Sequence, residues 1–80
     1  MERERRNNID IIADILKETK EPLRITGIVY SCNLNFNIVR KKLEYLIKRG
    51  LLKNIGNRRY KRTEKAIEFL SRYESLKEYQ

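Results

Sequence analysis

The sequence lacks most of the residues that catalytic sites need. It contains no histidine, and Cys32 is its only cysteine. The commonest general base is therefore absent, no intramolecular disulfide can form, and Cys32 has no second thiol or imidazole with which to hold a metal. No glycine-rich phosphate loop is present either. We expect no enzymatic activity, no cofactor, no metal and no small-molecule substrate.

Long apolar runs are also missing. No stretch of 18 apolar residues occurs, and charged residues interrupt the N-terminus, where a signal peptide would need an apolar segment. Eighty residues are enough for one domain with a small core. We expect a soluble, cytoplasmic protein with a single domain at 1–80, including a flexible tail at 1–6 and a C-terminal helix at 63–80.

Acidic residues are scarce in the middle of a basic chain. The chain has 19 Lys and Arg against 11 Asp and Glu, a net charge of +8. Residues 23–62 hold eleven of these cations and the single acid Glu44, a net charge of +10, so the two flanks together carry −2. This segregation indicates a face that binds a polyanion, either nucleic acid or an anionic membrane surface. Membrane binding is disfavoured, because the cations belong to elements that carry core-forming apolar stripes of their own.

Apolar spacing predicts helices, and short apolar runs bounded by turn residues predict strands. Pro22 ends the first helix because proline cannot continue it. The expected order is a helix beginning at Asn7 or Asn8, an extended segment at 23–25, a brief helix at 26–32, a turn at 33–35, a helix at 35–49, strands at 51–55 and 59–62 around a turn at 56–58, and a last helix at 63–80.

Polar residues precede several of these helices in positions where their side chains can act as N-caps. The expected N-caps are Asn7 or Asn8, Thr26, Asn35 and Thr63, and Gly50 is expected as a left-handed C-cap. We expect Tyr30 and Phe36 in the core rather than as platforms for stacking bases, and Cys32 as a buried or half-buried side chain.

The order helix, short strand, helix, helix, strand, strand, helix is typical of a winged helix-turn-helix domain, an α+β fold that is mostly helical. In this layout the helix at 35–49 lies in the major groove, and the basic hairpin at 53–62 forms a wing that reaches an adjacent groove or the backbone. With the basic middle segment, this pattern predicts a protein that binds double-stranded DNA as a transcription regulator or nucleoid-associated protein.

Amide and cationic side chains on these elements are the candidate contacts, since they can bond to base edges and phosphates. The candidate DNA-binding residues are Arg24, Thr26, Asn35, Asn37, Arg40, Lys41, Tyr45, Lys48, Asn57, Arg58, Arg59 and Lys61. The alternative is that the helix cations form only a solvated face and the wing cations only protect a hairpin edge. The scarcity of acids favours DNA contact.

Three stretches, at 26–36, 45–52 and 60–70, resemble an archaeal family of winged helix-turn-helix DNA-binding proteins. The most specific match consists of Tyr30, Asn33, Leu34, Asn35 and Phe36. The resemblance covers about residues 8–76. It implies a homodimer, because the family includes small Sulfolobus proteins that dimerise through a C-terminal antiparallel coiled coil.

A last helix of about four turns is too short for a long coiled coil. We therefore expect a dimer built from shorter last helices, with help from a second apolar side of the first helix. The candidate dimer residues are Ile11, Ile15, Leu70, Tyr73, Leu76 and Tyr79. The alternative is that the end of the last helix folds back on its own domain.

A second interpretation comes from a different class of function. The domain could serve as a protein–protein interaction module in a larger complex, with its basic face on an acidic partner. This interpretation predicts little binding to free duplex DNA, even at low salt concentration.

Overall fold

The computed structural model describes residues 6–79. Within them the predicted order of helices and hairpin strands is confirmed, while the extended segment between the first two helices forms no strand of its own. The elements are α1 (Asn8–Glu18), α2 (Ile25–Cys32), α3 (Phe36–Lys48), β1 (Leu52–Asn54), β2 (Tyr60–Arg62) and α4 (Glu64–Lys77). Residues 1–5 of the predicted tail and Gln80 of the predicted last helix lie outside the described residues. No helix within 6–79 is long and apolar enough to cross a membrane.

The two strands form an antiparallel hairpin, in which Leu52 pairs with Arg62 and Asn54 with Tyr60. The predicted extended segment at 23–25 is reduced to one bridge between Leu23 and Tyr60. The Leu23 amide donates to the Tyr60 carbonyl at 3.0 Å, and the Tyr60 amide donates to the Leu23 carbonyl at 2.8 Å. This bridge ties the start of α2 to the base of the hairpin.

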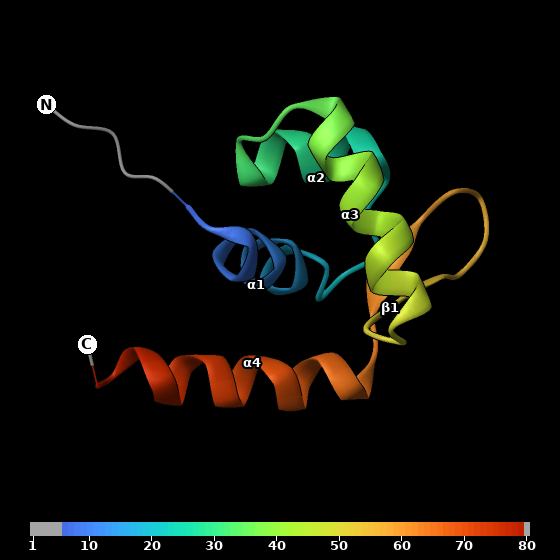
Figure 1. Ribbon diagram of the computed structural model, residues 1–80. Helices are drawn as coiled ribbons and strands as arrows, with labels where there is room; N and C mark the ends of the chain where they lie inside the picture. The colour runs from blue at the N-terminus through green and yellow to red at the C-terminus, as the bar shows by residue number, and fades with distance from the viewer. Residues whose placement is uncertain (1–5, 80) are drawn as a thin grey trace, which may run out of the picture.

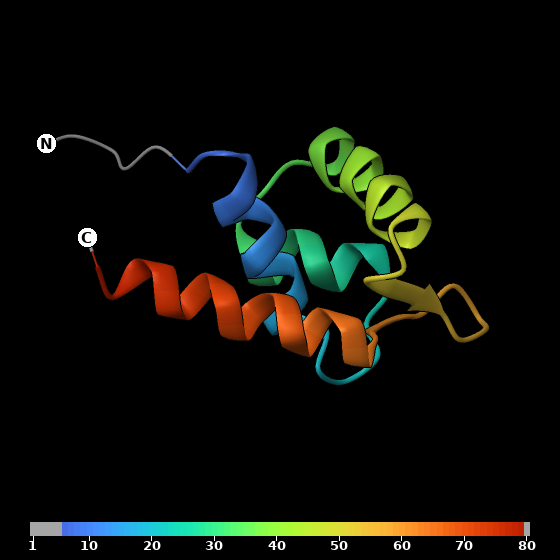
Figure 2. The same cartoon turned by 60° about the horizontal axis from the view of Figure 1, so that its bottom comes forward.

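The helices surround one core, and the hairpin loop projects from it (Figure 1). α1 contacts both α2 and α4, while α2 contacts α3. In Figures 1 and 2 the loop between β1 and β2 lies at the opposite end of the molecule from the C-terminal end of α4. The surface around α3 and the hairpin is therefore separate from the surface at the end of α4.

Apolar residues from every helix meet in the core. Its fully buried side chains include Ile15, Ile28 and Leu46. The buried polar residue Thr19 satisfies its hydroxyl by donating to the Ile15 carbonyl at 2.9 Å. Cys32 is buried as expected, and burial raises the pKa of its thiol to about 11, so it stays protonated at neutral pH.

Most of the predicted helix caps are confirmed. The side chains of Asn7, Asn35 and Thr63 accept hydrogen bonds from backbone amides in the first turns of α1, α3 and α4. Gly50 follows α3 with a φ of 76°, in the left-handed region that glycine tolerates. These caps depend on neighbours three residues away, which explains why local sequence predicts them.

The expectation that Thr26 caps α2 is wrong. α2 begins at Ile25, its N-cap is Arg24, and no side chain caps it. The Leu23–Tyr60 bridge fixes the chain immediately before Arg24, so the helix begins earlier than the capping pattern suggested and Thr26 lies inside its first turn.

Three expectations about burial are also wrong. Tyr30 is 86% exposed and Phe36 is 42% exposed, so neither is a core residue. Tyr30 lies about 200° around α2 from the buried Ile28, at 100° per residue. Ile15 is fully buried within the monomer and offers no surface to a partner, because α1 is covered from two sides by α2 and α4.

Candidate nucleic-acid interface

α3 presents one polar face to solvent. Val39, Leu43 and Leu46 point into the core. Asn37, Lys41 and Lys48 share the opposite side, since each lies within about 40° of the next at 100° per residue. Their side chains are exposed. An exposed helix face with an amide and two ammonium groups can bond to both base edges and phosphates.

The tip of the hairpin is built by three consecutive residues with positive φ. Gly56, Asn57 and Arg58 have φ values of 110°, 52° and 58°. The turn is closed by the Ile55 amide, which donates to the Arg59 carbonyl at 2.9 Å, and by the Gly56 amide, which donates to the Asn54 side chain at 2.9 Å. Arginine in the left-handed region is strained by roughly 1–2 kcal/mol. The turn holds Arg58 in this conformation and presents its side chain to solvent.

Three arginines from three separate elements line one cleft. Arg24 precedes α2, Arg40 lies on α3, and Arg58 lies at the hairpin tip. We call this the arginine cleft. Its apolar lining includes Leu43, Ile47 and Tyr60, and Thr26 and the acid Glu44 also line it. Three guanidinium groups around one concavity form a site suited to an anion such as a backbone phosphate.

The fold matches known proteins. A family model described as winged helix-turn-helix covers residues 5–80. The chain belongs to the winged helix-turn-helix family. The crystal structure of Sso10a-2, a DNA-binding protein from Sulfolobus solfataricus, is similar with a TM-score of 0.81 and 28% sequence identity. That match covers 92% of this chain and 81% of the other. A search of curated proteins gave no match. The resemblance to an archaeal winged helix-turn-helix family is thus confirmed.

In this winged helix-turn-helix chain, the structure brings some of the predicted DNA-binding residues together and not others. Arg24, Thr26, Arg40 and Arg58 share the arginine cleft. Tyr45 lies outside this cleft. It lines a groove between α3 and α4 that also includes Phe69, where the Arg49 guanidinium lies 5.3 Å from its ring centre, and it shares a second hollow on α3 with Lys41 and Lys48.

Two predicted residues have side chains that bond within the domain. The side-chain oxygen Oδ1 of Asn35 accepts a hydrogen bond from the Ile38 amide at 2.8 Å, as the cap of α3. The Lys61 ammonium donates to the Lys20 carbonyl at 3.0 Å, so it is directed toward the segment after α1. Arg62 behaves similarly, since it donates to the Leu16 carbonyl at 3.3 Å. Part of the basic middle segment thus stabilises the wing against α1 rather than facing outward.

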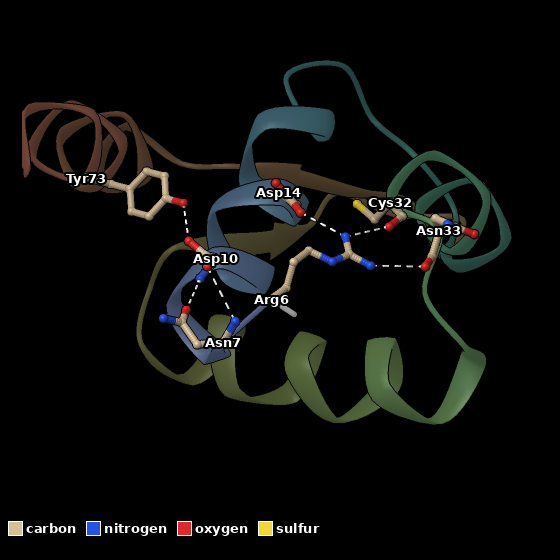
Figure 3. A network of polar contacts seen from close by, with 7 residues as sticks. All are labelled: Arg6, Asn7, Asp10, Asp14, Cys32, Asn33 and Tyr73. Atoms are coloured by element: carbon tan, nitrogen blue, oxygen red, sulfur yellow. Dashed lines mark hydrogen bonds and ion pairs between the residues drawn. The ribbon is translucent and has the colours of Figure 1, made fainter. Parts of the chain in front are cut away.

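Sequence analysis missed the structural role of Arg6, which lies in the predicted flexible tail. Its guanidinium donates to the Cys32 carbonyl at 2.8 Å, to the Asn33 carbonyl at 3.1 Å and to the Asp14 carboxylate at 2.9 Å (Figure 3). Cys32 and Asn33 end α2, where carbonyls lack partners in the helix. Arg6 therefore fastens the start of the chain to the turn between α2 and α3. No local pattern could reveal a contact 26 residues away.

Tyr73 joins α4 to α1. Its hydroxyl donates to the Asp10 carboxylate, as Figure 3 shows. The hydrogen bond lowers the pKa of Asp10 and raises the pKa of Tyr73 to about 12. Its ring stacks on Phe69 with centres 6.4 Å apart. The predicted dimer residue Tyr73 thus binds its own domain, and Ile11 and Leu70 also pack against the core.

The Tyr73 hydrogen bond predicts a pH-dependent effect on stability. Because the folded pKa of Asp10 is lowered, its contribution is present above the ordinary pKa of 3.8 and is lost as pH falls through the folded value. Because the folded pKa of Tyr73 is raised, its contribution is present below 10.0 and is lost as pH rises through about 12. We expect Tyr73→Phe to lower the melting temperature by a few degrees between about pH 5 and 9, and this effect to shrink as pH falls through the lowered folded pKa of Asp10.

Thermal unfolding followed by circular dichroism across this pH range checks the prediction. Tyr30→Phe is the matched control, since Tyr30 is 86% exposed, and it should not change the melting temperature at any pH. An equal loss for Tyr73→Phe at all pH values would show that the effect does not depend on the ionised Asp10 carboxylate, and would contradict the prediction.

Proposed function

We propose that this protein binds double-stranded DNA and does so without catalysis. The arginine cleft carries the proposal, because it places three guanidinium groups beside the cationic face of α3. A helix fits the major groove, and cations on the groove walls fit the phosphates on either side. The similarity to a DNA-binding protein from Sulfolobus solfataricus supports the same function.

In the proposed complex α3 lies in the major groove, with Asn37 and Arg40 near base edges. Lys41 and Lys48 contact phosphates, and the wing places Arg58 and Arg59 on the adjacent backbone. Phosphate contacts carry no sequence information, whereas amide and arginine contacts to bases do. This combination suits a nucleoid-associated protein or transcription regulator in the cytoplasm of an archaeal cell.

We also propose that the protein is a homodimer joined through α4. Leu76 and Tyr79 are 65% and 88% exposed at the end of the chain farthest from the wing. Phe69, Arg72, Leu76 and Tyr79 are spaced by three, four and three residues, the spacing with which two helices pack side by side. Leu76 and Tyr79, the two exposed apolar side chains on this spacing, favour a second α4 as the partner. The interface comprises the Phe69–Tyr79 side of α4, without Ile15.

Fluorescence anisotropy of a labelled random-sequence duplex, titrated with the protein at about 50 mM salt, tests DNA binding. We expect a dissociation constant in the micromolar range or tighter. No binding at this salt concentration would contradict sequence-independent duplex binding. The basic face would then be better explained by an acidic protein partner. Selection from a pool of random duplexes would test the remaining alternative, a regulator that binds only one specific sequence.

A further inference from the structure

Phe36 is an exposed aromatic residue at the start of α3, beside the cationic side chain of Arg40. It is the first residue of α3, it is 42% exposed, and it lies outside the hydrophobic core cluster. Its exposed ring gains nothing from contact with phosphates. A partner that binds more tightly because of this ring must present apolar groups beside negative charge.

The surroundings of Phe36 hold it in a defined position. The Arg40 guanidinium lies 5.6 Å from the ring centre, a distance at which a cation attracts the face of an aromatic ring. Asn35, the preceding residue, caps α3 and fixes the backbone where Phe36 begins the helix. Asn37, the next residue, is exposed. The ring is therefore attached to a rigid helix start and flanked by groups that suit DNA.

The position of Phe36 on α3 indicates which apolar group of DNA its ring would contact. In helix-turn-helix proteins the N-terminal residues of the second helix meet base edges in the major groove. The apolar group that a base presents there is the 5-methyl group of thymine, and phenylalanine is one of the side chains that contacts it. Ile47, which is also exposed, is near the other end of α3 and lines the arginine cleft.

We propose that Phe36 contacts the 5-methyl group of thymine in the major groove, so that the protein favours duplexes carrying a methyl group at that position. This inference rests on the proposed binding of duplex DNA through α3. It adds a source of sequence preference that does not depend on hydrogen bonds, and it assigns a role to an aromatic side chain that the core does not use.

Replacing thymine by deoxyuridine removes the methyl group and keeps base pairing and backbone charge unchanged. We would measure the binding of one thymine-containing duplex, and of the same duplex with deoxyuridine at every thymine, to wild type and to Phe36→Ala. Wild type should bind the deoxyuridine duplex more weakly, by about fourfold for each methyl group that it buries. Phe36→Ala should bind the two duplexes equally, and Phe36→Leu should restore part of the difference.

Two controls separate the methyl contact from other effects. Ile67 is an apolar side chain of α4 that is 52% exposed. The variant Ile67→Ala should keep the wild-type preference. A duplex of G·C pairs should gain affinity for wild type when its cytosines carry a 5-methyl group, since that group occupies the same place in the major groove. Circular dichroism confirms that each variant is folded.

The outcomes distinguish this inference from the proposed function. Equal binding of both duplexes by wild type, or a preference that survives Phe36→Ala, overturns the methyl contact and leaves duplex binding in place. If Phe36→Ala weakens binding to both duplexes equally, Phe36 has a contact that does not involve the methyl group, and the inference is again overturned. If wild type binds none of these duplexes, the inference is overturned together with the proposed sequence-independent binding of duplex DNA.

Discussion

Binding to a random duplex is expected to weaken by about 10³–10⁵-fold when the salt concentration rises from about 50 to 200 mM. Each phosphate that a cation neutralises releases condensed counterions, and the decrease in affinity grows with the number of phosphates neutralised. The proposed interface offers six exposed cations in each subunit, namely Arg24, Arg40, Lys41, Lys48, Arg58 and Arg59. A dimer that uses about half or more of them neutralises the roughly 6–10 phosphates that this decrease requires.

The double variant Arg40→Gln/Arg58→Gln identifies which cations are involved. It should lower the slope of log affinity against log salt concentration by about 0.9 for each phosphate that the variant no longer neutralises. Lys20→Gln/Lys77→Gln is the matched control, because it changes the net charge equally at two positions outside α3, the wing and the arginine cleft. Anisotropy titrations at several salt concentrations measure the slopes. Equal slopes for the two double variants would show that net charge, rather than the arginine cleft, attracts the DNA.

The elements of the fold were predictable because their signals are local. Asn35 and Thr63 cap helices through bonds to residues three positions away, and Gly50 ends α3 through its own backbone conformation. Because these interactions join residues close together in the chain, the sequence alone indicates them. The order of elements then follows, and with it the winged helix-turn-helix fold.

Burial and side-chain direction were predicted less well, because they depend on contacts between distant segments. Periodicity placed Ile15 on a second apolar side of the first helix, but only the positions of α2 and α4 show that this side is buried. Lys61 is a cation on the wing, as a DNA contact would be, yet its ammonium group donates to the Lys20 carbonyl. Arg6 is read as part of a charged tail until the end of α2 is seen beside it.

The candidate site shows the same division between local and distant contacts. The basic middle segment correctly indicated α3 and the wing as charged elements, since charge is counted from the sequence alone. Sequence could not show that Arg24, Arg40 and Arg58 converge, because the Leu23–Tyr60 bridge brings the start of α2 to the hairpin. Nor could it show that Phe36 is exposed, since an aromatic residue at the start of an amphipathic helix is usually expected inside.

Replacing Leu76 by glutamate is expected to convert the dimer to a monomer and to weaken duplex binding by about 10²-fold or more. Leu76 lies on the α4 side that we assign to the partner helix, and a carboxylate placed in that apolar contact would lose its water of hydration. A dimer holds its second α3 near the DNA once the first has bound, and a monomer loses this advantage. Sedimentation equilibrium measures the mass, which should fall to the 9.7 kDa of one chain.

Ile67→Glu is the matched control, because Ile67 is also exposed on α4 but lies nine residues from Leu76, about 180° around the helix. It should leave the dimer and its DNA affinity unchanged. The salt dependence provides a second readout, since a monomer neutralises half as many phosphates and its slope should be half that of the dimer. If Leu76→Glu becomes monomeric and keeps the full slope, each domain contacts DNA independently and the two α3 helices of a dimer do not bind one duplex together. If Ile67→Glu dissociates the dimer and Leu76→Glu does not, the partner lies on the opposite side of α4.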